Sequence, residues 1–424
     1  MINPSRWFIS GCCRCLDEAG RAPQGRRASL YLEETVMKRL ITIEGVKKTL
    51  FGSGAVGSLP AELEALGAAR AMLVMDRALS EMELGRRVQE ILAQGPVEAL
   101  PFFRVSPEPA PELADEGAEL ARQEQVDCVI GVGGGSTLDV AKAIGVLAKN
   151  EGKALDYVGL NLVKAPGLPT VMVPTTAGTG SETTFTAVFT MRGTKTKGGI
   201  NSPFLYPVLA ILDPELTLGL PPYPTAYTGM DALTHAIESY TSLQSHFVTD
   251  ALSLEAVKMI AGSLRGAVFQ GGNLHYRIRM LQASYLAGLG LAMSGVGAVH
   301  ALAYPLGAFF DIPHGIANAL MLPYVLDFNF PGSTEKFAAV AVAMGAPAKG
   351  RSERALAAEA AERVWELSQD IGAPLRLRDL GVPEDAIPRM AEAAMNVTRP
   401  ILNNPRPMSA AAAEKIYRRA FEGR

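Results

Sequence analysis

The amino-acid sequence predicts an α/β domain with a mostly parallel sheet, followed by an all-helical domain. Three observations lead to this fold class. The chain has 424 residues, which is too long for one small core and suggests two or three globular domains. Short apolar runs alternate with helical stretches from residue 37 to about residue 214, a pattern typical of a parallel sheet with crossover helices. Beyond that point strand signals nearly vanish, and apolar residues recur at helical spacing.

The expected elements follow in chain order. Five apolar runs predict strands over residues 48–51, 71–75, 127–132, 170–173 and 208–212. The segments between them predict helices over residues 59–66, 81–92, 111–123 and 137–147. The second half predicts helices over residues 227–242, 247–265, 276–293, 354–371 and 409–421. We therefore expect an α/β domain over residues 37–214, an all-helical domain over residues 215–424 and a cleft between them.

Residues 1–36 differ from the rest of the chain. They contain five arginines, the cluster Cys12, Cys13 and Cys15, and little apolar periodicity. The apolar stretch before the cysteines is too short for a secretion signal, and the cluster lacks the second ligand pair of zinc motifs. We therefore expect a disordered extension over residues 1–36. Four cysteines in a chain of this size do not form a disulfide framework, which favours a reducing, cytoplasmic compartment.

Charge and hydropathy exclude two classes of partner. The chain has 43 acidic and 40 basic residues, so no basic excess attracts nucleic acid or an anionic membrane. Residues 281–310 contain no Asp, Glu, Lys or Arg, and by length this run could span a bilayer. Its several glycines, His300 and Pro305 favour a pair of buried core helices instead. We expect neither a nucleic-acid partner nor a membrane partner.

Two glycine-rich loops follow predicted strands, and either could hold the phosphates of a dinucleotide. The first, residues 52–57, reads GSGAVG, and Asp76 lies nineteen residues beyond Gly57 at the end of the next predicted strand. In a dinucleotide fingerprint with this spacing, the helix N-terminus binds the pyrophosphate and the acid binds a ribose hydroxyl. A plain tight turn is the alternative for this loop and for the second loop described next.

The second loop, residues 131–136, reads GVGGGS and leads directly from a predicted strand into a helix. Three consecutive glycines let backbone amides approach a phosphate closely. Ser136 and Asp139 predict a capping box at the helix start, with Lys142 one turn further on. Strand ends of such a sheet meet at one edge, so Asp76 could serve either loop, and the residues alone leave the choice open.

A third segment, residues 174–182, reads PTTAGTGSE and follows another apolar strand. Its hydroxyls and small residues suit hydrogen bonding to a polar ligand such as a ribose or an amide. A solvated loop is the alternative.

A carboxylate and three imidazoles lie in apolar surroundings. Asp231 and His235 are spaced i, i+4 in an apolar helical stretch, so they project from one face. His300 lies inside the uncharged run, and His314 follows fourteen residues later. One divalent metal bound by all four would satisfy imidazoles that are costly to bury unpartnered. Satisfied core histidines are the alternative. Three nitrogens and one oxygen suit iron(II) and zinc equally, and the net charge near +1 would lower the pKa of a bound alcohol.

Several motifs occur in a fixed order along the chain. They are GGGS at 133–136 with Asp139 and Lys142, PTTAGT at 174–179, MDALTHAIE at 230–238, His300 with Pro305, His314 with Gly315, and NNPR at 403–406. Together they resemble the iron-containing (group III) alcohol dehydrogenases, from about residue 37 to the end of the chain. The resemblance implies a dehydroquinate-synthase-like fold, with a Rossmann-like nucleotide domain and a helical domain that holds the metal.

The resemblance also assigns roles to residues. It implies that the pyrophosphate lies at Gly134, Gly135 and Ser136, while the first glycine loop is structural. Asp76 matches the position that holds the adenosine ribose and disfavours a 2′-phosphate, which predicts NAD rather than NADP. The further implied cofactor contacts are Thr175, Thr176 and Lys197. The implied metal ligands are Asp231, His235, His300 and His314.

The implied activity is metal-dependent, NAD-linked interconversion of primary alcohols or diols and aldehydes by hydride transfer. We expect iron(II), with zinc as the alternative, a small-molecule alcohol or aldehyde substrate, and a homodimer or higher homo-oligomer. The alternative activity is that of a hydroxyacid-oxoacid transhydrogenase or a maleylacetate reductase, which acts on an acid. An acid substrate requires a cationic anchor, and the apolar lining expected from Phe185, Phe309 and Phe310 offers no clear one.

Two positions depart from the pattern of the family. Tyr304 stands where many members have a histidine assigned to the proton path beside the nicotinamide. A phenol titrates near pH 10 when unperturbed, so we expect the proton of the alcohol to leave through water and the cofactor ribose. Because a phenol can still donate and accept a hydrogen bond, Tyr304 is a further catalytic candidate. Glu108 stands where asparagine is common, so no cofactor contact is predicted there.

Overall fold

The computed structural model describes residues 40–191, 193 and 196–423. The chain divides into two units, Met1–Ile43 and Glu44–Arg424. Of the first unit only residues 40–43 are described, and they carry no helix or strand. The disordered extension predicted over residues 1–36 lies outside the described residues. All elements named below belong to the second unit.

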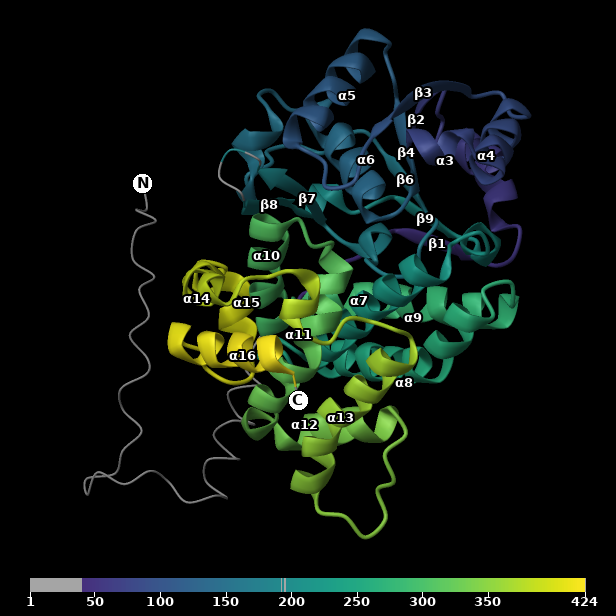
Figure 1. The fold of residues 1–424 in the computed structure, drawn as a ribbon. Helices are drawn as coiled ribbons and strands as arrows, with labels where there is room; N and C mark the ends of the chain where they lie inside the picture. The colour runs from purple at the N-terminus through teal and green to yellow at the C-terminus, as the bar shows by residue number, and fades with distance from the viewer. Residues whose placement is uncertain (1–39, 192, 194–195, 424) are drawn as a thin grey trace. The chain divides into compact units, whose positions relative to one another are not determined.

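A six-stranded sheet, parallel at every pairing, organises the first half of this unit (Figure 1). In spatial order the strands are β1 (Lys48–Phe51), β9 (Leu209–Leu212), β6 (Thr170–Pro174), β4 (Cys128–Gly133), β2 (Arg70–Asp76) and β3 (Glu98–Val105). Five of the six correspond to predicted strands. The strand β3 was not predicted, because this edge strand contains Pro101 and polar residues at both ends, which interrupt its apolar run.

Helices cover both faces of the sheet. They are α2 (Leu59–Ala65), α3 (Arg77–Glu81), α4 (Glu83–Ala93), α5 (Pro111–Gln123) and α6 (Gly135–Leu147). On one face α2 and α4 share a core with Leu73 and Met75, and on the other α5 and α6 share a core with Met72 and Val74. Since successive side chains of a strand point to opposite faces, β2 is apolar at every interior position.

A second, smaller sheet has three strands: β5 (Gly159–Leu160), β7 (Thr186–Met191) and β8 (Thr196–Asn201). Their spatial order is β5, β8, β7. The strands β7 and β8 form an antiparallel pair, and β5 adds to β8 in parallel. None of the three was predicted. The strand β5 has only two residues, and β8 reads TKGGIN, with one apolar residue. The short apolar stretch of β7 was overlooked. This pair supplies one wall of the cleft described below.

The second half of the unit is helical. Its α-helices are α7 (Pro222–Thr241), α8 (Phe247–Phe269), α9 (Leu274–Ser294), α10 (Ala298–Phe310), α11 (His314–Asn329), α12 (Thr334–Ala343), α13 (Glu353–Asp370), α14 (Ile387–Met395), α15 (Thr398–Asn403) and α16 (Ala410–Glu422). The largest hydrophobic core runs through them, and α11 is buried along almost its whole length. A parallel sheet followed by helices confirms the predicted fold class. Both halves belong to one compact unit, so the division after residue 214 stays a prediction.

The uncharged run forms the second part of α9 and all of α10. These two helices meet at an angle of 101° across a short break at residues 295–297. Among the described residues no single helix is long and apolar enough to cross a membrane; only this bent pair, taken together, meets that criterion. Nearly all of the run is buried or half-buried inside the helical core.

Candidate active site

A cleft of about 820 Å³ lies between the sheet loops and the helices. The sheet side contributes the start of α6 and the segment after β6, and the small sheet contributes Lys197. The helical side contributes α7, α10 and α11. The predicted site residues among its lining are Gly135, Ser136, Lys197, Asp231, His235, His300, Tyr304 and His314. The structure thus brings the two predicted kinds of site, the glycine loop and the histidines, to one cavity.

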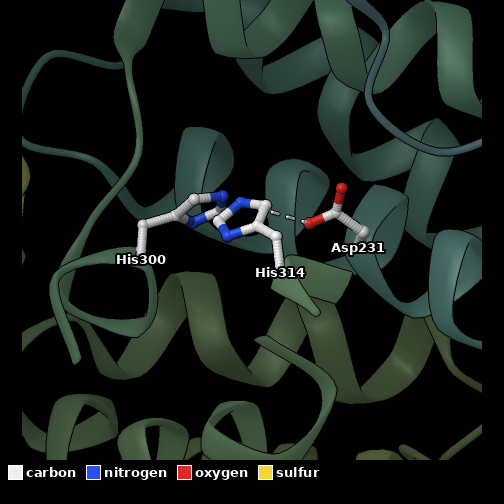
Figure 2. A group of neighbouring side chains, drawn as sticks. All are labelled: Asp231, His300 and His314. Atoms are coloured by element: carbon white, nitrogen blue, oxygen red, sulfur yellow. Dashed lines mark ion pairs between the residues drawn. The ribbon is translucent and has the colours of Figure 1, made fainter. Parts of the chain in front are cut away.

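Three helices bring the carboxylate and imidazoles together. Asp231 and His235 leave the same face of α7, His300 lies in the first turn of α10, and His314 is the first residue of α11. Ligand atoms of Asp231, His300 and His314 all lie within 4.8 Å of one another (Figure 2). His235 stands beside this group, with Nε2 at 3.8 Å from Asp231 Oδ1 and its ring stacked on that of His300 at 4.9 Å.

Each imidazole places one nitrogen near an oxygen of Asp231. His235 Nδ1 lies 3.3 Å from the Gly178 carbonyl oxygen, which leaves Nε2 toward the carboxylate. His314 Nε2 lies 3.9 Å from Asp231 Oδ1. The Asn318 amide nitrogen stands among these atoms: it donates to Asp231 Oδ1 at 2.7 Å and lies 3.2 Å from Nε2 of both His300 and His314.

The protonation states suit metal ligation. Burial lowers the pKa of His235, and burial together with the charge of Lys197 holds the pKa of His314 well below its ordinary value. Both rings are therefore neutral at pH 7 and carry a free lone pair. Burial alone would raise the pKa of Asp231, but the three imidazoles and the Asn318 amide outweigh it and lower that pKa. An ionised carboxylate beside neutral imidazoles is a donor set that fits a divalent ion such as iron(II) or zinc.

Tyr304 borders the imidazoles without bonding to them. Its ring lies 5.7 Å from the His314 ring and 6.4 Å from the His300 ring, measured between centroids. Burial, reinforced by the charges of Glu238 and Asp231, raises the pKa of Tyr304 to about 12. The phenol therefore keeps its proton at neutral pH and can act as a hydrogen-bond donor, not as a base.

The second glycine loop leads into a helix start that faces the cleft. The helix α6 begins at Gly135 with Gly134 as its N-cap, and no side chain accepts a bond from the cap. The predicted capping box is wrong, because Asp139 is engaged elsewhere: it accepts bonds from Ser181 Oγ at 2.5 Å and from the Val188 amide at 2.9 Å. The first-turn amides of α6 therefore have no side-chain partner, which leaves them for an anionic ligand.

The first glycine loop uses its amides internally. The amides of Gly54 and Val56 donate to the two carboxylate oxygens of Asp213, at 3.1 and 3.2 Å. Asp213 follows β9 and is fully buried. These donors are occupied by the protein itself, so residues 52–57 do not offer a phosphate site.

The other predicted cofactor residues have different surroundings. Asp76 ends β2 and caps α3, with Oδ1 accepting a bond from the Leu79 amide at 2.8 Å, and it does not line the cleft. Thr175 is buried, its amide bonded to the Gly133 carbonyl oxygen at 3.0 Å. The methyl group of Thr176 lies 3.6 Å from the position that a Cβ on Gly134 would take.

Lys197 lines the cleft as half of an ion pair. Its Nζ lies 2.7 Å from Glu108 Oε2, and Thr190 Oγ1 donates to the same carboxylate at 2.8 Å. The Glu108 backbone is left-handed, with φ of 53°. The residue that departs from the family pattern therefore neutralises the lysine that the resemblance places near the cofactor.

Comparison with known proteins gives the family. The family model described as "Iron-containing alcohol dehydrogenase" matches residues 47–214, and that described as "Fe-containing alcohol dehydrogenase family, C-terminal" matches residues 225–421. The chain belongs to the iron-containing alcohol dehydrogenase family. As a member it is an oxidoreductase that interconverts alcohols and aldehydes, and the family implies a bound metal ion and NAD(H).

The similar proteins cover almost the whole enzyme. The 1,3-propanediol dehydrogenase of Klebsiella pneumoniae is 40% identical over 373 residues, which are 88% of this chain and 96% of that protein. The long-chain-alcohol dehydrogenase 1 of Geobacillus thermodenitrificans is 38% identical, over 88% of this chain and 94% of that protein. A crystal structure of 1,3-propanediol oxidoreductase matches with a TM-score of 0.88 and 39% identity, covering 90% of this chain and all of that one.

Sequence reasoning missed three polar residues of the alcohol dehydrogenase site. Glu238 and Asn318 contact the proposed metal ligands, and Arg399 lines the cleft. Glu238 and Asn318 could have been found by helical spacing, since Glu238 lies seven residues beyond Asp231 and Asn318 four beyond His314. Arg399 had no local signal. It lies over the Phe185 ring at 5.8 Å and forms no ion pair with another described residue, so the cleft does contain a cation besides Lys197.

Proposed function

We propose that this enzyme is an iron(II)-dependent, NAD-linked alcohol dehydrogenase that acts on primary alcohols or diols. The observation that carries the proposal is the convergence of Asp231, His300 and His314 within 4.8 Å, in the wall of the cleft that also contains the start of α6. The donor set suits zinc as well, so zinc is the alternative metal. Relatives named for 1,3-propanediol and long-chain alcohols support this substrate class.

In this proposal the helical part holds the metal and the sheet part holds the cofactor. Asp231, His235, His300 and His314 are the metal ligands. Gly134, Gly135 and Ser136 bind the pyrophosphate through the free amides of α6, and Asp76, at the same edge of the sheet, binds the adenosine ribose. Thr175, Thr176 and Lys197 are the further cofactor contacts. The division after residue 214 separates the two tasks, and a homo-oligomer in the cytoplasm remains our expectation.

When bound, the ion would supply Lewis acidity and NAD would supply the hydride acceptor. The chain contributes orientation and an apolar part of the cleft wall. The apolar side chains of Leu291, Val296 and Phe309 line the cleft and limit the water beside the reacting atoms. Tyr304 keeps its proton and donates, so the proton of the alcohol leaves by another route, through water.

The test is metal analysis of the full chain purified without oxygen, followed by NADH-linked assays with aldehydes and alcohols. We expect about one iron per chain and turnover of butanol or propanediol above that of 4-hydroxybutyrate. The variant His235→Ala should lose metal. Its activity should fall by more than the roughly 10- to 100-fold typical when a residue that only hydrogen-bonds to a metal ligand is removed. Full metal content and full activity in that variant would refute the ligand assignment. Preference for 4-hydroxybutyrate would favour the acid-substrate alternative and give Arg399 the role of anchor.

A further inference from the structure

We infer that Glu238 is a positioning residue that fixes the tautomer of His300 and thereby prepares Nε2 for the metal. The inference deepens the proposed function and rests on His300 being a ligand. Glu238 lies on α7, two turns beyond Asp231 on the same face. Its side chain is 5% exposed and that of His300 is 3% exposed, so the pair is shielded from solvent.

The contacts of Glu238 leave it one role. Oε2 lies 2.5 Å from His300 Nδ1, and Oε1 accepts a bond from the Val299 amide at 2.6 Å. An ionised carboxylate only accepts hydrogen bonds, so His300 Nδ1 must carry a proton. Short bonds of this kind to a charged acceptor are the strong class of hydrogen bond.

The opposite side of the ring sets the other nitrogen. His300 Nε2 lies 3.2 Å from the Asn318 amide nitrogen, which is itself identified as the donor by its 2.7 Å bond to Asp231. Of the two N–H groups of Asn318, one donates to Asp231, and the other faces Nε2 of both His300 and His314, at 3.2 Å from each. A shared N–H needs a lone pair on each ring nitrogen, so we take Nε2 of His300 as an acceptor. His300 is therefore the neutral Nδ1–H tautomer, whose lone pair at Nε2 points among the other proposed ligands. A carboxylate, an imidazole and a metal in series is the arrangement that raises ligand basicity at metal sites.

The same carboxylate fixes the position of α10. The amides of Ala298 and Val299 belong to its first turn, where intrahelical partners are lacking. Glu238 Oε1 accepts from Val299, and Asn404 Oδ1 accepts from Ala298 at 3.2 Å. Asn404 is held in turn by reciprocal bonds with Asn329, at 2.7 and 2.8 Å. The NNPR segment at residues 403–406 thus helps to hold the helix that presents His300.

Glu238 also changes the charge of the site. Asp231 alone, with three neutral imidazoles and a divalent ion, would give a net charge near +1. Two buried carboxylates, Asp231 and Glu238, make the assembly neutral. A neutral assembly holds the ion more tightly, and this predicts that removal of the Glu238 charge weakens metal affinity.

The test uses the full chain, freed of metal with a chelator and titrated with Zn²⁺. In Glu238→Gln the amide oxygen can accept from Val299, but the NH₂ group then faces His300 and favours the proton on Nε2. We expect the Zn²⁺ affinity to fall about 10- to 100-fold. Nitrogen-15 NMR of the metal-free protein should show the His300 proton moving from Nδ1 to Nε2, with His300→Ala identifying the signal.

The matched control is Asp213→Asn. It makes the same exchange of carboxylate for amide at a buried residue that accepts bonds only from backbone amides, those of Gly54, Val56 and Glu215. Its Zn²⁺ affinity and its histidine signals should equal those of the wild type. If Glu238→Gln fails to fold, Glu238→Asp takes its place, and we expect it to keep the Nδ1–H tautomer with a loss of affinity smaller than 10-fold.

The outcomes separate this inference from the proposed function. Wild-type Zn²⁺ affinity and an unchanged His300 tautomer in Glu238→Gln would overturn the role of Glu238, while a loss of affinity in His300→Ala would still support the metal site. Unchanged affinity in His300→Ala would overturn both, because His300 would then not be a ligand. Weakened binding in Asp213→Asn equal to that in Glu238→Gln would also overturn the inference, since the effect would be one of general stability.

Discussion

The two glycine loops of this protein have similar sequences but differ in whether their backbone amides are hydrogen-bonded to a side chain. Residues 52–57 follow β1 and residues 131–136 span the end of β4, both at the carboxyl edge of the sheet. In the first loop, the amides of Gly54 and Val56 donate to Asp213. In the second, the amides at the start of α6 have no side-chain partner and face the cleft. Glycine makes a close approach of backbone to phosphate feasible, but only unpaired amides make a binding site.

The largest expected difference between the loops comes from Gly135→Val. A Cβ at Gly135 would lie 2.6 Å from Thr179 Cγ2, so the helix start or the threonine must shift. Overpacking of this kind costs about 1–3 kcal/mol, which corresponds to roughly a 10- to 100-fold loss of NADH affinity if it falls on the bound geometry. Fluorescence titration with NADH measures the loss. The control is Gly57→Ala in the first loop, where a Cβ meets nothing within 4 Å and NADH affinity should not change.

The variant Asp213→Ala tests whether the first glycine loop has a structural role only. Removal of this carboxylate leaves the buried amide of Val56 and its neighbours without their acceptor, at about 1–3 kcal/mol. The free energy of unfolding in urea should fall by about that amount, while NADH affinity stays at the wild-type value. A variant of normal stability that no longer binds NADH would reverse the roles assigned to the two loops.

The smallest expected effect is a change of cofactor preference in Asp76→Asn. Asparagine keeps the side-chain oxygen that accepts from the Leu79 amide, so α3 remains capped. Loss of the negative charge removes about 1 kcal/mol of repulsion toward a 2′-phosphate, so kcat/KM for NADPH should rise by up to about 10-fold relative to NADH. Asp127→Asn, at the opposite end of the neighbouring strand, bonds only to the amides of Ala69 and Arg70 and should leave the ratio unchanged. An equal shift in both variants would refute a specific role for Asp76.

Sequence patterns predicted the parts of the fold with strong apolar signals. The buried strands β2, β4 and β6 are largely apolar runs that alternate with helices along the chain. The edge strand β3 and the strand β8 were missed because exposed or polar residues occupy much of each. The strand β7, which reads TAVFTM, has a short apolar stretch that was overlooked, and its pairing with β8 identifies it. The capping box predicted at Ser136 does not form, because Asp139 accepts hydrogen bonds from Ser181 and Val188, which are distant in the chain.

Some residues of the candidate site were likewise predictable from the sequence, and others were not. Residue types and helical spacing were enough to single out Asp231, His235, His300 and His314, because ionisable side chains in apolar surroundings require partners. Only the tertiary structure could give Glu238 its partner, since His300 lies 62 residues away in the chain. Likewise, only the folded chain pairs Lys197 with Glu108 and leaves Arg399 without an ion pair among the described residues.

The sequence by itself therefore determined the fold class, the family and the identity of the four proposed ligands. These follow from apolar periodicity and from motifs whose residues are close in the chain. The tertiary structure decided which glycine loop keeps free amides, which tautomer His300 adopts and what net charge surrounds the metal position. Each of those depends on hydrogen bonds between distant segments, such as Asp213 with Gly54 and Glu238 with His300, and no local pattern in the chain encodes them.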